Sequence, residues 1–158
     1  MGKGKKLYVG NPLGFSDAGR FWLKERLLPK LSALGFEIIN PWEYAMEMDS
    51  SQLRKLSSKM PRSEAIMLGD KNAQRIRGSD IFLAVLDGAD VDSGTAAEIG
   101  YAYALGKRII GYRGDFRLST DIDSCTVNLQ IEAFIDGSGG KICATLEEVI
   151  DELRRAKG

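Results

Sequence analysis

The sequence predicts a single doubly wound α/β domain, with a mainly parallel, five-stranded sheet between two layers of helices. Segments typical of strands alternate with segments typical of helices along the whole chain. Several strand-like segments are continuously apolar, as expected when a parallel sheet is buried on both faces. The chain has 158 residues, which suits one domain over residues 1–158.

The N-terminal part predicts a strand, a helix and a second strand. Residues 7–10 (LYVG) are apolar and are followed by the turn signal NP, so a strand should end there. Ser16 or Asp17 can cap the next helix. The segment GFEIIN then predicts a second strand, which Pro41 ends. The helix is indicated by apolar residues at roughly helical spacing: Phe21, Leu23, Leu27, Leu28 and Leu31.

The middle of the chain repeats this alternation. Residues 46–60 are weakly patterned and suggest a short helix and a loop, whereas residues 63–76 predict a regular helix. SDIFLAVLDG is a buried strand ending at Leu86. A helix with almost only small and apolar residues covers 96–106, and KRIIGYRG predicts a fourth strand.

The C-terminal part predicts one more strand and a closing helix. LQIEAFI, residues 129–135, is interpreted as the fifth strand. ATLEEVIDELRRAK is a helix in which Thr145 and Glu148 form a capping box. In such a sheet a ligand binds beyond the carboxyl ends of the strands, near the switch in strand order. The segments there are GNPLGFS, NPWEY, DGADVDSG and YRGD.

Composition excludes several classes of function. The formal net charge is zero, so nothing favours nucleic acid or an anionic membrane as a partner. No stretch has the roughly 20 apolar residues of a membrane span, and no signal-peptide pattern opens the chain. Cys125 and Cys143 have no metal-like spacing and imply no disulfide framework. We therefore expect a soluble, cytoplasmic protein.

The chain contains no histidine. This excludes Ser–His–Asp and Cys–His catalysis, and it removes the commonest nitrogen ligand of zinc sites. The acidic loop DGADVDSG lacks the residue order of a calcium loop, and no phosphate-binding glycine motif follows the first strand. Any catalysis must then depend on carboxylates, tyrosines, amides or lysines.

Glu98 is the most informative residue, because it is a carboxylate inside an almost wholly apolar helix. Thr95 and Glu98 fit the spacing of a capping box, which would explain the glutamate structurally. A helix that is apolar all round is buried, however, and a buried carboxylate is costly unless it is paired or used. The sequence thus favours a functional Glu98, and capping can coexist with that role.

The other candidates each have a structural alternative. Asp92, six residues before Glu98, could simply complement the helix dipole. Tyr8 is expected in the core of the first strand, where its phenol would need a partner, and Glu98 is a candidate. Asp87 could be an ordinary loop residue. Asn72 and Asn128 could be ordinary surface amides, and Phe15 and Trp42 could equally be packing residues or walls for a flat ligand.

Four segments together resemble the nucleoside 2-deoxyribosyltransferase family. They are LYVGNPLGFS, NPWE, the long segment from DKNAQRIRG to GYRGD, and VNLQIEAFI, in the family's order over nearly the whole chain. The most specific part is the block D-S-G-T-x-x-E-x-G-x-A. The resemblance implies a flavodoxin-like doubly wound domain, assembly into dimers or larger homo-oligomers, and no metal or organic cofactor. It implies transfer of 2-deoxyribose between nucleobases through a glycosyl-enzyme ester.

The resemblance also implies roles for individual residues. Glu98 matches the nucleophile, Tyr8 its hydrogen-bond donor and Asp92 the aspartate of the pocket. Asn128 matches an asparagine that contacts the sugar from an adjacent subunit. Asn72 stands where some members have an aspartate that is proposed to assist the base. An amide can bind the edge of a base but cannot protonate it. Asp70 is two residues away, and which of the two residues contacts the base stays open. Further substrate-contacting positions are expected at Phe15, Trp42, Gly10, Asp87 and Gly94.

Two other functions stay open at this point. Related enzymes hydrolyse nucleoside 5′-monophosphates, for which Ser16 and Arg20 near the end of the first strand could bind the phosphate. A domain that binds nucleotides without catalysis is the more remote alternative, because a fold alone does not determine function. Deoxynucleosides and nucleobases remain the expected partners.

Overall fold

The computed structural model describes residues 4–157 and contains one parallel sheet. Its five strands follow the spatial order β2-β1-β3-β4-β5, and every neighbouring pair is parallel. This is the strand order of flavodoxin, so the predicted doubly wound fold is confirmed. The strands are β1 (Lys6–Gly10), β2 (Glu37–Ile39), β3 (Ile81–Val85), β4 (Arg108–Tyr112) and β5 (Ile142–Cys143).

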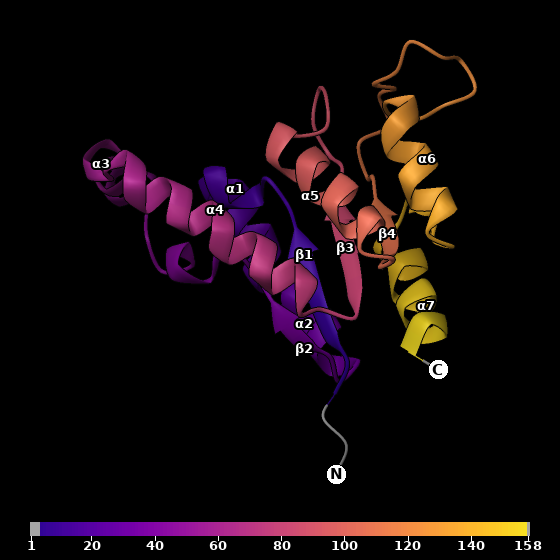
Figure 1. The fold of residues 1–158 in the computed structure, drawn as a ribbon, viewed down its shortest axis with the longest axis horizontal. Helices are drawn as coiled ribbons and strands as arrows, with labels where there is room; N and C mark the ends of the chain where they lie inside the picture. The colour runs from indigo at the N-terminus through magenta and orange to yellow at the C-terminus, as the bar shows by residue number, and fades with distance from the viewer. Residues whose placement is uncertain (1–3, 158) are drawn as a thin grey trace.

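Helices connect the strands and cover both faces of the sheet (Figure 1). The regular helices are α1 (Asp17–Trp22), α2 (Leu28–Ala33), α3 (Ser50–Lys59), α4 (Arg62–Arg77), α5 (Ser93–Ala104), α6 (Leu129–Gly137) and α7 (Leu146–Lys157). A wider π-type turn, Leu23–Leu27, joins α1 to α2, and short 3-10 turns lie at Leu13–Phe15 and Glu43–Ala45. Among the described residues, no helix is both long and apolar enough to cross a membrane.

The sheet separates two apolar layers. On one face, Leu7 and Val9 pack with residues of α2 and α7 such as Leu31 and Val149. On the other face, residues of α4, α5 and α6 pack against the alternate strand positions, including Tyr8 and Phe82 of β1 and β3. Both layers use buried side chains that alternate along the same strands, as the pleat of a strand requires. The continuous apolar runs in the sequence reflect this burial on both faces.

One predicted element is wrong. The segment 129–135, expected as a strand, is the helix α6, which Asn128 caps by accepting a hydrogen bond from Gln130 N at 2.9 Å. The segment alternates apolar and polar residues as a strand does, but Ile131 and Ile135 are also four residues apart and face the core together. A helix is needed here, because parallel strands must be joined by a crossover. The fifth strand is β5, which is too short to show a pattern.

Two segments extend away from this compact sandwich. Figure 1 shows α3 and the start of α4 at the far left, beyond the edge of the sheet. The predicted weak pattern of 46–60 corresponds to α3, in which no residue is buried. The segment between β4 and α6 projects at the upper right of the same view. It carries exposed apolar side chains, with Phe116 94% and Leu118 64% exposed.

Candidate active site

The candidate site lies at the carboxyl ends of β1 and β3, where the strand order switches direction. The chain leaves β1 toward β2 on one side, whereas β3 and β4 lie on the other. Ligands of doubly wound folds bind at such a switch point. The helix α5 begins just after β3, so its first turns stand at this edge with Glu98 in the second turn.

Glu98 and Tyr8 are joined by a short hydrogen bond. The Tyr8 hydroxyl donates to Glu98 Oε1 at 2.6 Å, across elements 90 residues apart in the chain. The Tyr8 side chain is fully buried and stacks on Phe82, with ring centroids 5.2 Å apart. The ring is therefore fixed by packing, and its phenol holds the Glu98 carboxylate in one orientation.

Burial determines the protonation of this pair. Desolvation raises the pKa of the Glu98 carboxyl, the hydrogen bond from Tyr8 lowers it, and the negative charge of Asp92 raises it again, so that the net shift is upward. Burial and the charge of Glu98 raise the pKa of Tyr8 well above its usual range. The phenol thus stays a neutral donor at physiological pH, and it opposes the desolvation that would protonate Glu98.

Asp92 caps α5. Its Oδ2 accepts a hydrogen bond from Thr95 N at 2.9 Å and one from Thr95 Oγ1 at 3.3 Å. The capping box considered for Thr95 and Glu98 is wrong, because Asp92 is the capping residue and Glu98 bonds to Tyr8 instead. The structural interpretation of Asp92 is correct, yet the same side chain also lines the cavity in front of Glu98.

A cavity of about 170 Å³ opens in front of the two carboxylates. Phe15 and Trp42 line it and contact each other edge to face, with ring centroids 4.6 Å apart. Trp42 Nε1 donates a hydrogen bond to the Asn11 carbonyl at 2.8 Å. The predicted residues Phe15, Trp42, Asn72, Asp92, Gly94 and Glu98 all line this cavity. The sequence thus indicated most of its lining.

Asn72 reaches the cavity from α4. Its Oδ1 is buried and has no hydrogen-bond partner among the described residues. An unpaired buried amide oxygen costs free energy, so the site favours a ligand that donates a hydrogen bond to it. Asp70 does not line this cavity.

Four lining residues were not predicted: Pro41, Tyr44, Leu68 and Thr95. Two of them carry signals that sequence reasoning could have used. Leu68 lies one helical turn before Asn72 on α4, and residues four apart share a face. Tyr44 lies two residues after Trp42, in the segment NPWEY that follows the second strand.

Besides Tyr8, which bonds to Glu98 from β1, three predicted residues do not line the cavity. Gly10 lies behind Glu98: a Cβ there would stand 2.9 Å from Glu98 Oε2 and 2.5 Å from Phe82 Cζ. Asp87 accepts a hydrogen bond from Asp115 N at 2.9 Å, so it orders the loop after β4. Asn128 caps α6 and lines a separate polar cavity of about 250 Å³ with residues such as Asp90 and Ser119.

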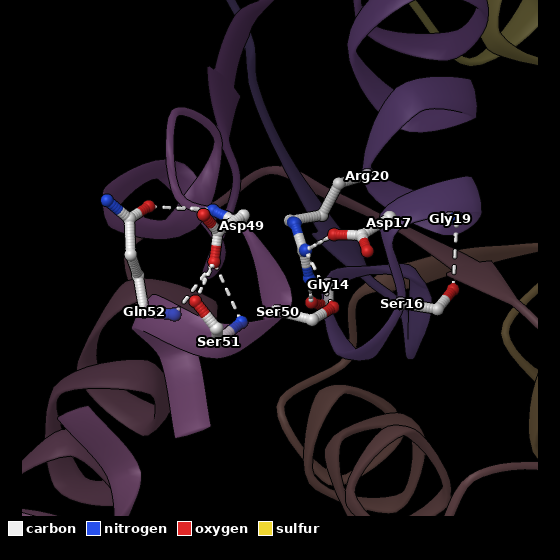
Figure 2. Close-up of polar contacts among 9 residues, drawn as sticks. All are labelled: Gly14, Ser16, Asp17, Gly19, Arg20, Asp49, Ser50, Ser51 and Gln52. Atoms are coloured by element: carbon white, nitrogen blue, oxygen red, sulfur yellow. Dashed lines mark hydrogen bonds and ion pairs between the residues drawn. The ribbon is translucent and has the colours of Figure 1, made fainter. Parts of the chain in front are cut away.

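Arg20 and Ser16 are used by the fold itself. The Arg20 side chain is buried; its Nη1 donates to the Gly14 carbonyl at 2.6 Å, and its Nη2 contacts Asp17 and, at 3.2 Å, Ser50 Oγ (Figure 2). Ser16 Oγ accepts the Gly19 amide at 3.0 Å as the cap of α1. The basic group considered for a 5′-phosphate is therefore already engaged.

Residues 7–140 match the family model described as nucleoside 2-deoxyribosyltransferase. The chain belongs to this family. Membership in the nucleoside 2-deoxyribosyltransferase family indicates an enzyme of the deoxyribosyltransferase or N-glycosidase kind, acting on nucleosides and nucleobases. The matched residues include Tyr8, Glu98 and all the residues that line the Glu98 cavity. No curated protein matches the chain significantly.

Solved structures share the fold over almost the whole chain. A conserved protein from Enterococcus faecalis V583 is 26% identical, with a TM-score of 0.72 over 96% of this chain and 98% of its own. A 2-deoxyribosyltransferase from Bacillus psychrosaccharolyticus is 19% identical, with a TM-score of 0.68 over 92% of this chain and 90% of its own. A CMP N-glycosidase from Clostridium botulinum is 21% identical, with a TM-score of 0.55 over 94% of this chain and 98% of its own. The last two similarities concern the fold alone.

Proposed function

We propose that this protein transfers 2-deoxyribose from a 2′-deoxynucleoside to another nucleobase, with Glu98 as the nucleophile. The observation that carries the proposal is the Tyr8–Glu98 hydrogen bond of 2.6 Å at the wall of a cavity with aromatic sides. A carboxylate held in one orientation and facing a pocket suits attack on an anomeric carbon. Phe15 and Trp42 offer flat apolar surfaces for a nucleobase.

The reaction proceeds in two displacements. In the first, a Glu98 oxygen forms a bond to C1′ while the C1′–N bond breaks; the electron pair leaves with the base, which takes up one proton. In the second, a nitrogen of the acceptor base loses its proton and attacks C1′, and the electron pair of the ester bond returns to Glu98. Two inversions at C1′ give overall retention.

The surroundings of Glu98 support both steps. The transition states are cation-like, so a negative carboxylate stabilises them in addition to forming the bond. The hydrogen bond from Tyr8 lowers the pKa of the Glu98 carboxyl and so opposes the rise that burial causes, which favours the ionised nucleophile. Asp92 adds a second negative charge at the cavity wall.

Asn72 is proposed to bind the base edge. Its unpaired Oδ1 can accept a hydrogen bond from an exocyclic amine or a ring N–H of the base. An amide cannot act as a general acid, so the leaving base gains its proton from another source. The expected result is that good leaving groups react much faster than poor ones.

Free deoxynucleosides suit this site better than 5′-monophosphates. Within the described residues, the lining of the Glu98 cavity includes Asp92 and Glu98 but no lysine or arginine. Arg20 is bonded to Gly14, Asp17 and Ser50. A phosphate dianion would therefore meet negative charge without a cationic partner.

A second copy of the chain is proposed to complete the site through Asn128. In one chain Asn128 is exposed and does not line the Glu98 cavity. The projecting segment before it exposes Phe116 and Leu118, which an isolated chain has no reason to expose together. We expect at least a dimer in solution, and a fully active monomer by light scattering would contradict this.

Incubation with deoxyinosine, with and without adenine, tests the proposal. Deoxyadenosine should form with adenine faster than hypoxanthine is released without it. Deoxyinosine 5′-monophosphate serves as the comparison substrate. Release of hypoxanthine alone, with strong preference for the monophosphate, would instead favour the N-glycosidase.

A further inference from the structure

A second and larger cavity adjoins the Glu98 cavity. Its volume is about 460 Å³, and it lies between α3 and the turn that follows β1. The two cavities share four lining residues: Phe15, Trp42, Tyr44 and Leu68. The two cavities therefore adjoin along these shared side chains.

Three of the four shared side chains are aromatic. Trp42 lies between Phe15, at 4.6 Å, and Tyr44, at 6.3 Å between ring centroids. Phe15 is 67% exposed and Tyr44 is 44% exposed, so neither ring is held by the core. Exposed rings of this kind can turn about their side-chain bonds and allow a ligand to reach both cavities.

The lining of the larger cavity is mainly apolar. Leu53, Leu56 and Met60 contribute from α3 and its end, and Arg54 is the one charged residue among the lining residues in the described chain. Because α3 buries none of its residues, these side chains cover the cavity without being packed into the core. A ligand with an apolar arm would complete their packing.

The start of α3 is fixed in place over this cavity. Figure 2 shows Arg20 between the Gly14 carbonyl and Ser50 Oγ, so one buried guanidinium joins the turn after β1 to the first residue of α3. Asp49 and Gln52 form a capping box at the same end. The cavity is therefore preformed at its inner end and needs no large rearrangement to accept a ligand.

Resting on the proposed function, we propose that the larger cavity is an acceptor subsite for purines that carry a bulky, uncharged arm at C6. The Glu98 cavity of about 170 Å³ is small compared with the roughly 300 Å³ or more of ordinary ligand sites, and the adjoining space supplies the difference. A base held at Asn72 can direct a substituent past Tyr44 toward Leu53 and Leu56. Arg54 disfavours arms that end in a cation.

Two acceptors and three variants test the subsite. With deoxyinosine as donor, the wild type should transfer deoxyribose to adenine and to 6-benzylaminopurine. Leu56→Trp, at a position 40% exposed, should fill the cavity and lower kcat/KM for 6-benzylaminopurine by about tenfold or more while adenine changes less than about twofold. Ser57→Trp serves as a second filling variant. Lys55→Trp, on the same helix but lining neither cavity, is the matched control.

Binding gives a readout that does not depend on turnover. Calorimetry with 6-benzylaminopurine and Glu98→Gln should show binding that Leu56→Trp weakens in the same background. A purine with a 6-aminohexylamino arm, which ends in a cation, should accept deoxyribose more slowly than 6-benzylaminopurine does.

The outcomes separate this inference from the proposed function. Transfer to adenine but not to 6-benzylaminopurine, or equal losses for both acceptors in Leu56→Trp, would overturn the subsite alone. Absence of transfer to adenine would overturn the proposed function. A changed oligomer mass in both filling variants, without a change in acceptor preference, would show that a second copy covers this face, and would also overturn the subsite.

Discussion

Gly10→Ala is expected to impair catalysis through contacts behind Glu98. Gly10 is buried at the end of β1 and lies two residues after Tyr8, so a side chain there points to the same face of the sheet. A Cβ would lie 2.5 Å from Phe82 Cζ and 2.9 Å from Glu98 Oε2. The first atom belongs to the ring stacked on Tyr8, and the second belongs to the nucleophile itself.

The displacement can be worked out from these distances. Carbon atoms in contact prefer about 3.5–4.0 Å, so Phe82 or the strand must move by about 1 Å. Phe82 is stacked on Tyr8 at 5.2 Å, and its movement therefore disturbs the donor to Glu98 as well. A misplacement of about 1 Å can cost on the order of 10²-fold in rate. Overpacking should destabilise the fold by about 1–3 kcal/mol.

Gly111→Ala is the matched control. Gly10 and Gly111 both pair with Ala84, from opposite sides of β3. A Cβ at Gly111 meets aliphatic side chains, at 2.9 Å for Leu86, 3.1 Å for Ile142 and 3.2 Å for Ile135. It should therefore lower the melting temperature without a specific loss of transfer.

The assay combines thermal melting with steady-state transfer from deoxyinosine to adenine. A loss of 1 kcal/mol corresponds to about 2–4 °C at this chain length, so both variants should remain folded at 25 °C. Gly10→Ala should then lose about 10²-fold in kcat while Gly111→Ala loses little. A folded Gly10→Ala variant with wild-type kcat, or equal losses in both variants, would refute the reasoning.

Further predictions concern the Tyr8–Glu98 pair. Tyr8→Phe removes the hydrogen bond that lowers the pKa of Glu98, so the acidic limb of the pH–rate profile should move to higher pH; an unmoved limb would contradict the assigned role of Tyr8. Glu98→Gln should leave the fold intact and abolish transfer. Since the pKa of Glu98 is raised in the folded state, its contribution to wild-type stability is fully present below the unfolded value of about 4.3 and is lost as pH rises through the folded value. The melting temperature of Glu98→Gln minus that of the wild type should thus increase as pH rises from the unfolded to the folded pKa of Glu98. A difference that does not change with pH would argue against the raised pKa.

Sequence reasoning reached the central pair because local chemistry defined it. A carboxylate in an apolar helix needs a partner, and a tyrosine in a buried strand needs an acceptor. The resemblance to the family implied the same pair. The observed bond between Tyr8 and Glu98 confirms this expectation.

Other parts of the site depend on tertiary geometry. Asp87 bonds to the loop after β4, and Asn128 lines a separate cavity within one chain; no residue pattern reveals either arrangement. The α6 segment alternates apolar and polar residues as a strand does. It is nevertheless a helix, because the parallel strands β4 and β5 must be joined by a crossover. The larger cavity depends on where α3 stands, and α3 has little periodic signal because it buries no residue.

Trapping of the sugar tests the central claim most directly. A 2′-deoxy-2′-fluoro nucleoside slows both displacements, because fluorine destabilises the cation-like transition states. Intact mass spectrometry should then show one fluorosugar added to each chain, and peptide mapping should place it on Glu98. Glu98→Gln, with its fold verified by thermal melting, should show no adduct. An adduct on another residue, or transfer activity that persists in Glu98→Gln, would contradict the account.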